Sequence, residues 1–311
     1  WMLNPANKAE KVASAHVSLT LRKGKVVKKE ISGRLVDISA LPVDEDFMAE
    51  FKPQYDTVDK FVSQKIGSIS KTISTRNAFF GPSEFIDLTH SLQLAISGAE
   101  VSMAAPLSFD SSIKEGDILV SDMFKLYKYE NMLYTMMLSG KEVHDALEMS
   151  YSLWTNRMTS ADDHLLLLRE QRREGAEDRA SFKHPSYNFD SAAGIIYTVD
   201  VTKPAGEKVH IVSMADGTPF SMDRMYKVAV NSYRGNGGGE LLTEGAGIPQ
   251  EKLKERIVYS TDKDLRYYLM QYIERKGDID PRELDQWRFV PEEWTQTAAK
   301  RDYEYLFGIV R

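Results

Sequence analysis

A glycine-rich stretch in the last third of the chain limits its possible folds more than any other feature. Tyr226 to Val230 has the apolar pattern of a strand entering a core. Asn231 to Glu240 follows, with glycine at 235, 237, 238 and 239. A glycine inside a helix or strand costs about 0.5–1 kcal/mol. The run therefore predicts a loop whose backbone is left-handed or is closely approached by another group.

Large polar side chains surround this loop. Tyr233 and Arg234 stand at its entrance, and Asn236 and Glu240 lie near its floor. The combination indicates the mouth of a site for a planar, polar ligand such as a nucleoside, with a purely structural hairpin turn as the alternative. The loop is not a P-loop, because no Gly-Lys-Ser or Gly-Lys-Thr follows it, and it lacks G-x-G-x-x-G spacing before a helix.

Composition narrows the class of protein. The chain has 311 residues, of which 42% are hydrophobic and 28% charged, enough for one or two cores. A net charge of −6 argues against a nucleic acid polymer as partner. No apolar run approaches the roughly 18–20 residues of a membrane span, so we expect none. The absence of cysteine excludes disulfides and thiolate metal sites.

The first part of the chain predicts a small β unit followed by a helix. Two alternating runs flank the turn signal Arg22-Lys23-Gly24-Lys25, and a third short run comes after them. We expect strands at 12–21, 26–31 and 34–38. The stretch from Pro42 to Pro53 is acidic and bounded by prolines, and Tyr55 to Ile66 has helical apolar spacing. We expect an interdomain helix or linker here, with an isolated structural helix as the alternative.

The remainder alternates strand and helix patterns, which predicts an α+β fold of mixed β-sheets layered with helices. A helix is expected to begin at Pro82-Ser83-Glu84 and to end at Gly98. Within the stretch from Thr155 to Asn188, residues 169–179 are nearly continuous charge of both signs, which predicts a solvated helix or excursion. Further strands are expected at 69–74, 100–106, 132–138, 192–201 and 209–213, and helices at 121–126, 141–154 and 262–275, the last capped by Thr261 and ended by Gly277.

The strand that ends in Asn231-x-Tyr233-Arg234 before a glycine run resembles the signature of the 5′-nucleotidase family C-terminal domain. The form is that of 2′,3′-cyclic-nucleotide 2′-phosphodiesterase/3′-nucleotidases. The resemblance covers residues 69–290 well and the start of the chain loosely. It implies that residues 1–66 are the end of a preceding metallophosphoesterase domain plus a linker helix. It also implies that residues 67–311 are the substrate-binding domain.

The resemblance also implies a nucleotide site. Tyr129 and Tyr233 match the two aromatic positions that sandwich the nucleobase in the family, and each stacking face contributes roughly 1–3 kcal/mol for any base. Asn131 and Asn236 are expected to reach the base edge or to brace the loops. Arg76 matches a substrate-contacting Arg of related 5′-nucleotidases. The predicted substrate-binding set is Tyr129, Tyr233, Asn131, Asn236, Arg76, Arg234, Gly237, Gly238 and Gly239. Taken singly, Tyr129 is also compatible with a core aromatic, and Arg76 and Arg234 with surface ion pairs.

Two departures concern the branch of the family. Gly239 stands where the 5′-nucleotidase branch has an Asp that holds the ribose hydroxyls, and Phe109 stands where that branch has an Arg. Both losses favour the cyclic-phosphodiesterase/3′-nucleotidase branch.

No catalytic residue and no metal site is expected in this chain. The family's Asp-x-His, Gly-Asn-His-Asp/Glu and Gly-His-x-His metal motifs do not occur, and Asp162-Asp163-His164 is the nearest approach to a ligand cluster. With no Cys and no Gly-x-Ser-x-Gly elbow, a covalent nucleophile has no support either. The chain binds no cofactor by this interpretation, and the resemblance implies a divalent metal pair on a missing N-terminal metallophosphoesterase domain of the same polypeptide.

The resemblance therefore implies the nucleotide- or nucleoside-recognition domain of a metal-dependent nucleotide phosphohydrolase, a 2′,3′-cyclic phosphodiesterase/3′-nucleotidase or a 5′-nucleotidase, and we expect this chain to be inactive by itself. A non-catalytic nucleotide-binding module and a protein-interaction domain remain alternatives. The resemblance alone implies a periplasmic or cell-surface location.

Overall fold

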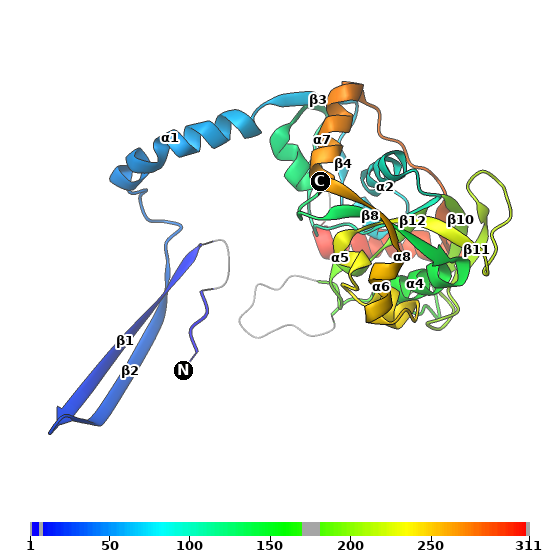
Figure 1. Ribbon diagram of the computed structural model, residues 1–311. Coiled ribbons are helices and arrows are strands. Elements are labelled where there is room, and N and C mark those ends of the chain that lie inside the picture. Colours follow the sequence, from blue (N-terminus) through cyan, green and yellow to red (C-terminus); the bar gives the residue numbers. More distant parts are fainter. Residues whose placement is uncertain (1, 6–8, 170–180, 309–311) are drawn as a thin grey trace. The chain divides into compact units, whose positions relative to one another are not determined.

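The computed structural model describes residues 2–5, 9–169 and 181–308 (Figure 1). The chain divides into two compact units, residues 1–60 and 61–311. The predicted charged stretch at 169–179 lies almost entirely outside the described residues. Among the residues described, no helix is both long and apolar enough to cross a membrane.

The first unit holds an antiparallel hairpin and a helix. Strands β1 (Lys11–Arg22) and β2 (Lys25–Asp37) pair along their whole length, with Val17 opposite Ile31. The two strands predicted at 26–31 and 34–38 are thus one strand, because Ser32 and Gly33 interrupt the apolar alternation but not the pairing.

Helix α1 (Glu45–Val62) includes most of the acidic stretch as well as most of the segment with helical spacing, so the helix begins earlier than the spacing predicted. Asp44 caps it by accepting a hydrogen bond from the Phe47 amide at 2.9 Å, and Glu45 and Asp46 place acidic charge at the positive end of the helix dipole. Pro53 lies within the helix, and none of the helix residues is buried. Ile66, which was predicted to be helical, lies instead in the next strand.

A mixed five-stranded sheet forms the centre of the second unit (Figure 1). Its order is β13-β8-β12-β5-β9, in which β12 runs parallel to β5 and antiparallel to β8. The strands are β5 (Val101–Ala104), β8 (Met132–Ser139), β9 (Ser191–Ala193), β12 (Met225–Asn231) and β13 (Ile257–Asp264).

Three smaller sheets complete the β structure. One has the order β11-β10-β15, the second β14-β3-β7, and the third pairs β4 with β6. Their strands are β3 (Lys65–Ile69), β4 (Ile73–Ser74), β6 (Ser112–Ile113), β7 (Gly116–Leu119), β10 (Ile195–Asp200), β11 (Val209–Met214), β14 (Asp278–Ile279) and β15 (Trp287–Val290).

The strand predicted at 192–201 is two strands in different sheets. Gly194 separates β9 from β10 with φ 92°, and a Cβ at this position would lie 2.0 Å from the Glu100 carbonyl oxygen. Only glycine allows this close approach together with the left-handed backbone.

Most of the longer helices of the second unit follow the sequence pattern, but the helix at Glu292–Phe307 was not predicted. The longer helices are α2 (Glu84–Ser97), α4 (Gly140–Trp154), α7 (Leu265–Lys276) and α8 (Glu292–Phe307), joined by the short helices α3 (Met123–Leu126), α5 (Ser232–Gly235) and α6 (Leu253–Arg256). The predicted end of α2 is confirmed, because Gly98 takes the left-handed conformation at φ 60°. The prediction for α7 is wrong at its start: Thr261 lies in β13, and Asp264 caps the helix.

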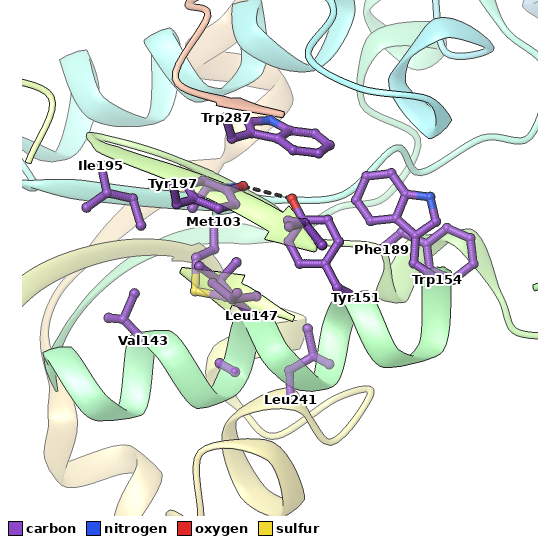
Figure 2. Packing of buried hydrophobic residues seen from close by; sticks show 14 of the residues in the cluster. Met103, Val143, Leu147, Tyr151, Trp154, Phe189, Ile195, Tyr197, Leu241 and Trp287 are labelled. Carbon is purple, nitrogen blue, oxygen red and sulfur yellow. Dashed lines mark hydrogen bonds between the residues drawn. The ribbon is translucent and has the colours of Figure 1, made fainter. Parts of the chain in front are cut away.

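The main core lies against α4 (Figure 2). The Tyr151 and Tyr197 hydroxyls share a hydrogen bond of 2.8 Å, and the Trp154 ring stacks on Phe189 at 5.5 Å. Trp287 from the C-terminal part of the chain is also buried in this cluster. Mixed sheets covered by helices confirm the α+β class.

Candidate functional site

One cavity of about 280 Å³ gathers two of the predicted aromatic residues. Its walls are Leu107, Tyr129, Asn131, Tyr187, Asn231 and Tyr233. Tyr129 is 39% exposed and Tyr233 is 43% exposed, so both residues are open to a ligand. The structure therefore brings Tyr129, Tyr233 and Asn131 to one cavity.

The central sheet explains why these distant residues meet. Strands β8 and β12 are antiparallel neighbours, with Asn231 opposite Leu133. Asn131 immediately precedes β8 and Asn231 ends β12, so both amides stand at one end of the sheet. Tyr129 lies in the loop before β8, and Tyr233 lies on α5 after β12.

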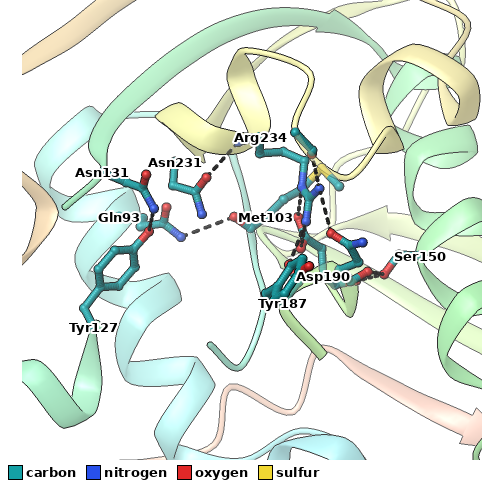
Figure 3. A network of polar contacts seen from close by, with 11 residues as sticks. Gln93, Met103, Tyr127, Asn131, Ser150, Tyr187, Asp190, Asn231 and Arg234 are labelled. Atoms are coloured by element: carbon teal, nitrogen blue, oxygen red, sulfur yellow. Dashed lines mark hydrogen bonds and ion pairs between the residues drawn. The ribbon is translucent and has the colours of Figure 1, made fainter. Parts of the chain in front are cut away.

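A buried phenol orients the Asn131 amide of the cavity (Figure 3). The Asn131 Nδ2 donates to the Tyr127 Oη at 3.5 Å. Burial raises the pKa of Tyr127 to about 12, although Asn131 and Asn231 lower the pKa of the same hydroxyl, so the hydroxyl is neutral near pH 7. The Asn231 Oδ1 accepts from the Arg234 amide at 2.8 Å and so caps α5.

Arg234 was predicted to bind substrate, but it does not line the cavity. It is instead a buried structural cation. The residue is 2% exposed, and its Nε and Nη2 donate to the two Asp190 carboxylate oxygens at 3.0 and 2.8 Å. The same guanidinium donates to the carbonyls of Tyr187, at 2.9 Å, and Gly238. Figure 3 shows Arg234 beside Asp190 and Tyr187. This fork-shaped cation thereby joins the turn before β9 to the glycine-rich loop.

The glycines of the loop do not line the cavity; they leave space for neighbouring side chains that pack against the loop. Gly237 and Gly239 have φ of 91° and 69°, which favours glycine at both positions. A Cβ on Gly238 would lie 2.5 Å from the ring of Tyr233. A Cβ on Gly239 would lie 2.0 Å from the Asn188 Oδ1. The space needed by an Asp side chain at 239 is therefore filled.

Two other predicted residues lie outside the cavity lining. The exposed Asn236 holds the loop through its carbonyl, which accepts from Gln250 Nε2 at 2.9 Å. Arg76 forms a two-point ion pair with Asp110, at 2.7 Å for each bond, and lines a different, charged depression. This pair lowers the pKa of the Asp110 carboxyl. The ion-pair alternative for Arg76 is thus the one the structure displays.

Sequence reasoning missed three cavity residues. Asn231 is part of the motif Asn231-x-Tyr233-Arg234, but it was not predicted to bind substrate. Tyr187 lies in a 3₁₀ turn (Ser186–Asn188), and Leu107 lies in the loop after β5. Neither carries a local signal, because only the tertiary fold places them beside Tyr233 and Tyr129.

The described residues include no group of three or more His, Asp or Glu side chains suited to a metal ion. In the weak candidate Asp162-Asp163-His164, the Asp163 carboxylate accepts from the Thr159 and Ser160 amides at 2.6 and 3.1 Å. His164 Nδ1 pairs with the buried Asp302 carboxylate. These side chains serve local structure, and the donor set does not fit a dimetal centre.

Comparison with known proteins shows which family and which relatives the chain resembles. The model of the 5′-nucleotidase C-terminal domain matches residues 65–244. The trifunctional nucleotide phosphoesterase protein YfkN of Bacillus subtilis is 29% identical over 195 residues, which cover 59% of this chain and 12% of that protein. The 2′,3′-cyclic-nucleotide 2′-phosphodiesterase/3′-nucleotidase of Haemophilus influenzae is 24% identical over 326 residues, covering 91% and 47%.

A solved structure agrees in fold. The crystal structure of a 5′-nucleotidase precursor from Thermus thermophilus superposes with a TM-score of 0.59 at 20% identity, covering 91% of this chain and 50% of that one. The chain spans about half, or less, of the length of the relatives described here. Because the family model matches more than half of its residues, the chain belongs to the 5′-nucleotidase C-terminal domain family.

Proposed function

We propose that this chain is the nucleotide-recognition part of a metal-dependent nucleotide phosphohydrolase. The observation that carries the proposal is that Tyr129 and Tyr233, far apart in the chain, line one cavity together with Asn131. Stacking on aromatic faces contributes roughly 1–3 kcal/mol per base and accepts any base, because every base has a π face.

The polar groups of the cavity suit the edge of a base. Asn131 and Asn231 each offer an amide; Asn131 donates to Tyr127, and Asn231 accepts from the Arg234 amide. An amide has both donor and acceptor atoms, so it can pair with the mixed edge of a nucleobase. Residue 239 is glycine, and the space that a side chain would need there is filled. Position 239 therefore offers no carboxylate to hold a free ribose diol. A 3′-nucleotide or a 2′,3′-cyclic nucleotide is therefore the substrate class we favour over a 5′-nucleotide.

Hydrolysis would need a second domain. We propose that residues 1–66 are the end of a metallophosphoesterase domain and its linker helix, and that this preceding domain carries the divalent metal pair. Apolar side chains of the hairpin, such as Val17, Leu19 and Leu21, are exposed, which supports a role as part of a larger domain. A metal pair supplies a hydroxide nucleophile at neutral pH, and the present residues would position the nucleotide for it. By resemblance, we place the protein in the periplasm or at the cell surface.

Calorimetric titration with 3′-AMP tests the recognition site. The double variant Tyr129→Ala/Tyr233→Ala is expected to lose detectable binding, since each ring accounts for about 1–3 kcal/mol, or roughly 5- to 150-fold in affinity. Tyr259→Ala is a matched control, because Tyr259 is an exposed tyrosine on β13 outside the cavity lining. Unchanged affinity in the folded double variant would refute the base sandwich.

A phosphate-release assay tests the division of labour. The purified chain, supplied with divalent metal and 3′-AMP, is expected to release no phosphate above background. Metal-dependent turnover by this chain would contradict the proposed second domain without affecting the recognition site.

A further inference from the structure

A third aromatic ring, that of Tyr187, stands on the wall of the cavity. Tyr187 is 36% exposed, similar to Tyr129 and Tyr233. It comes from the turn before β9, so a separate segment of the chain delivers it to the site.

The Tyr187 ring is packed against one of the two predicted stacking rings. The centroids of Tyr187 and Tyr233 are 6.1 Å apart and their planes meet at 89°. Edge-to-face contact is a favourable geometry for aromatic pairs. Gly238 also backs the Tyr233 ring, as the 2.5 Å clash of a Cβ at this position indicates. Two neighbours therefore fix the plane of Tyr233.

The turn that carries Tyr187 is anchored from two sides. Arg234 Nη2 donates to the Tyr187 carbonyl at 2.9 Å, and Arg234 directly follows Tyr233 in the chain. Ser150 Oγ, on α4, donates to the carbonyls of Asn188 and Asp190 at 3.2 and 2.8 Å. The backbones that bear the two rings are thereby joined through one buried cation.

We propose that Tyr187 is a positioning and specificity-determining residue of this cavity. It acts through its ring, which holds Tyr233 in the plane that stacks on a base. This inference rests on the proposed function. A fixed plane benefits a purine more than a pyrimidine, because the larger ring system overlaps more of the tyrosine face. Tyr187 thus raises affinity for nucleotides in general and for purine nucleotides in particular.

Calorimetry with 3′-AMP and 3′-UMP on the full chain tests this role. Tyr187→Leu keeps an apolar side chain but removes the ring, and Tyr187→Phe keeps the ring but removes the hydroxyl. We expect Tyr187→Leu to weaken 3′-AMP binding roughly three- to tenfold, the range set by an aromatic pair, with a smaller loss for 3′-UMP. Tyr187→Phe is expected to bind both nucleotides like the wild type.

The pair Tyr267–Tyr268 on α7 supplies a matched control. Its rings also meet edge to face, at 5.4 Å and 87°, and neither residue lines the cavity. Tyr267→Leu should leave both affinities unchanged. A crystal structure of Tyr187→Leu should in addition show the Tyr233 ring turned from its wild-type plane.

The possible outcomes separate this inference from the proposed function. Equal affinity of wild type and Tyr187→Leu, an equal loss for both nucleotides, or a loss in Tyr187→Phe as large as in Tyr187→Leu would each overturn the positioning role while leaving the site intact. An unmoved Tyr233 ring in the crystal would do the same. A wild-type chain that binds neither nucleotide would instead refute the proposed function, and this inference with it.

Discussion

At the scale of single residues, Gly238 shows how closely the glycine-rich loop is fitted to its aromatic neighbour. A Cβ there would lie 2.5 Å from the Tyr233 ring, which belongs to a residue of the cavity wall. Gly238→Ala is expected to displace the ring and weaken 3′-AMP binding by roughly tenfold, comparable with the loss of one stacking face.

Gly245→Ala serves as the control for that substitution. Its Cβ would lie 2.9 Å from the Met149 Cβ, so it also crowds a packed neighbour, but Gly245 does not line the cavity. Thermal unfolding and calorimetry should show lower stability without lower affinity for Gly245→Ala. Equal affinities for the two variants would contradict the role given to Gly238.

His90 is a buried residue whose titration should contribute to acid unfolding. It is fully buried, with its ring nitrogens 2.9 and 3.1 Å from the Ser102 and Ser191 hydroxyls, and burial lowers its pKa to about 3. The unfolded chain takes up this proton near pH 6.5, so unfolding gains a proton as the pH falls. Stability contributed by neutral His90 is complete above pH 6.5 and declines by up to about 1.4 kcal/mol per pH unit between 6.5 and about 3.

Urea unfolding from pH 7 to pH 4 measures this effect. His90→Gln can still bond both hydroxyls and should show a flatter pH dependence than the wild type, although it is less stable at pH 7. His210→Gln, at an exposed position on β11, should follow the wild-type profile. Parallel profiles for wild type and His90→Gln would show that another group controls acid unfolding.

At the scale of elements, the buried pair Arg234–Asp190 joins α5 to the turn before β9. Arg234→Met leaves the Asp190 carboxylate, itself in a residue 3% exposed, without its cation. Removing one partner of such a buried pair costs about 3–5 kcal/mol. We expect urea unfolding to show a loss of this order, accompanied by weaker 3′-AMP binding because Tyr187 and Tyr233 lose their common anchor.

Arg282→Met is the control for the pair. Arg282 bonds Asp280 at 2.8 Å, but both side chains are exposed. Exposed pairs contribute little, so no measurable change in stability or affinity is expected. A stable Arg234→Met variant with wild-type affinity would contradict the anchoring role.

The sequence predicted those elements whose patterns are local. β8, α4 and the end of α2 follow from apolar periodicity and from Gly98. The prediction failed for β13, an edge strand whose pairing with β8 contains register shifts and whose exposed residues lack strict alternation. It also missed the first part of α1, where Asp44 caps the helix and Pro53 lies within it.

The candidate site likewise contains residues that could be predicted from the sequence and residues that could not. Tyr129, Tyr233 and Asn131 were predicted through a family motif at the ends of strands, and the fold brings them together. The burial of Arg234 could not be predicted, because it depends on Asp190 from another segment. Tyr187 was missed for a similar reason: its position depends on a turn held by tertiary hydrogen bonds.

At the scale of the whole molecule, the division into two compact units predicts that the second unit folds and binds nucleotide without the first. The buried clusters draw all their described members from Ile66 onward, and α1 has no buried residue. A protein comprising residues 61–311 should therefore keep the thermal midpoint and the 3′-AMP affinity of the full chain. Differential scanning calorimetry and titration measure both, and a midpoint lowered by more than about 4 °C, equivalent to roughly 1–2 kcal/mol for a domain of this size, would show that the units depend on each other.

Tyr129 and Tyr233, two phenol rings from distant segments, are proposed to hold a nucleobase between them. A crystal structure of the chain with 3′-AMP tests this proposal most directly. We predict adenine between the rings of Tyr129 and Tyr233, with its edge toward Asn131. Density for the nucleotide at another place, with this cavity left empty, would contradict the account.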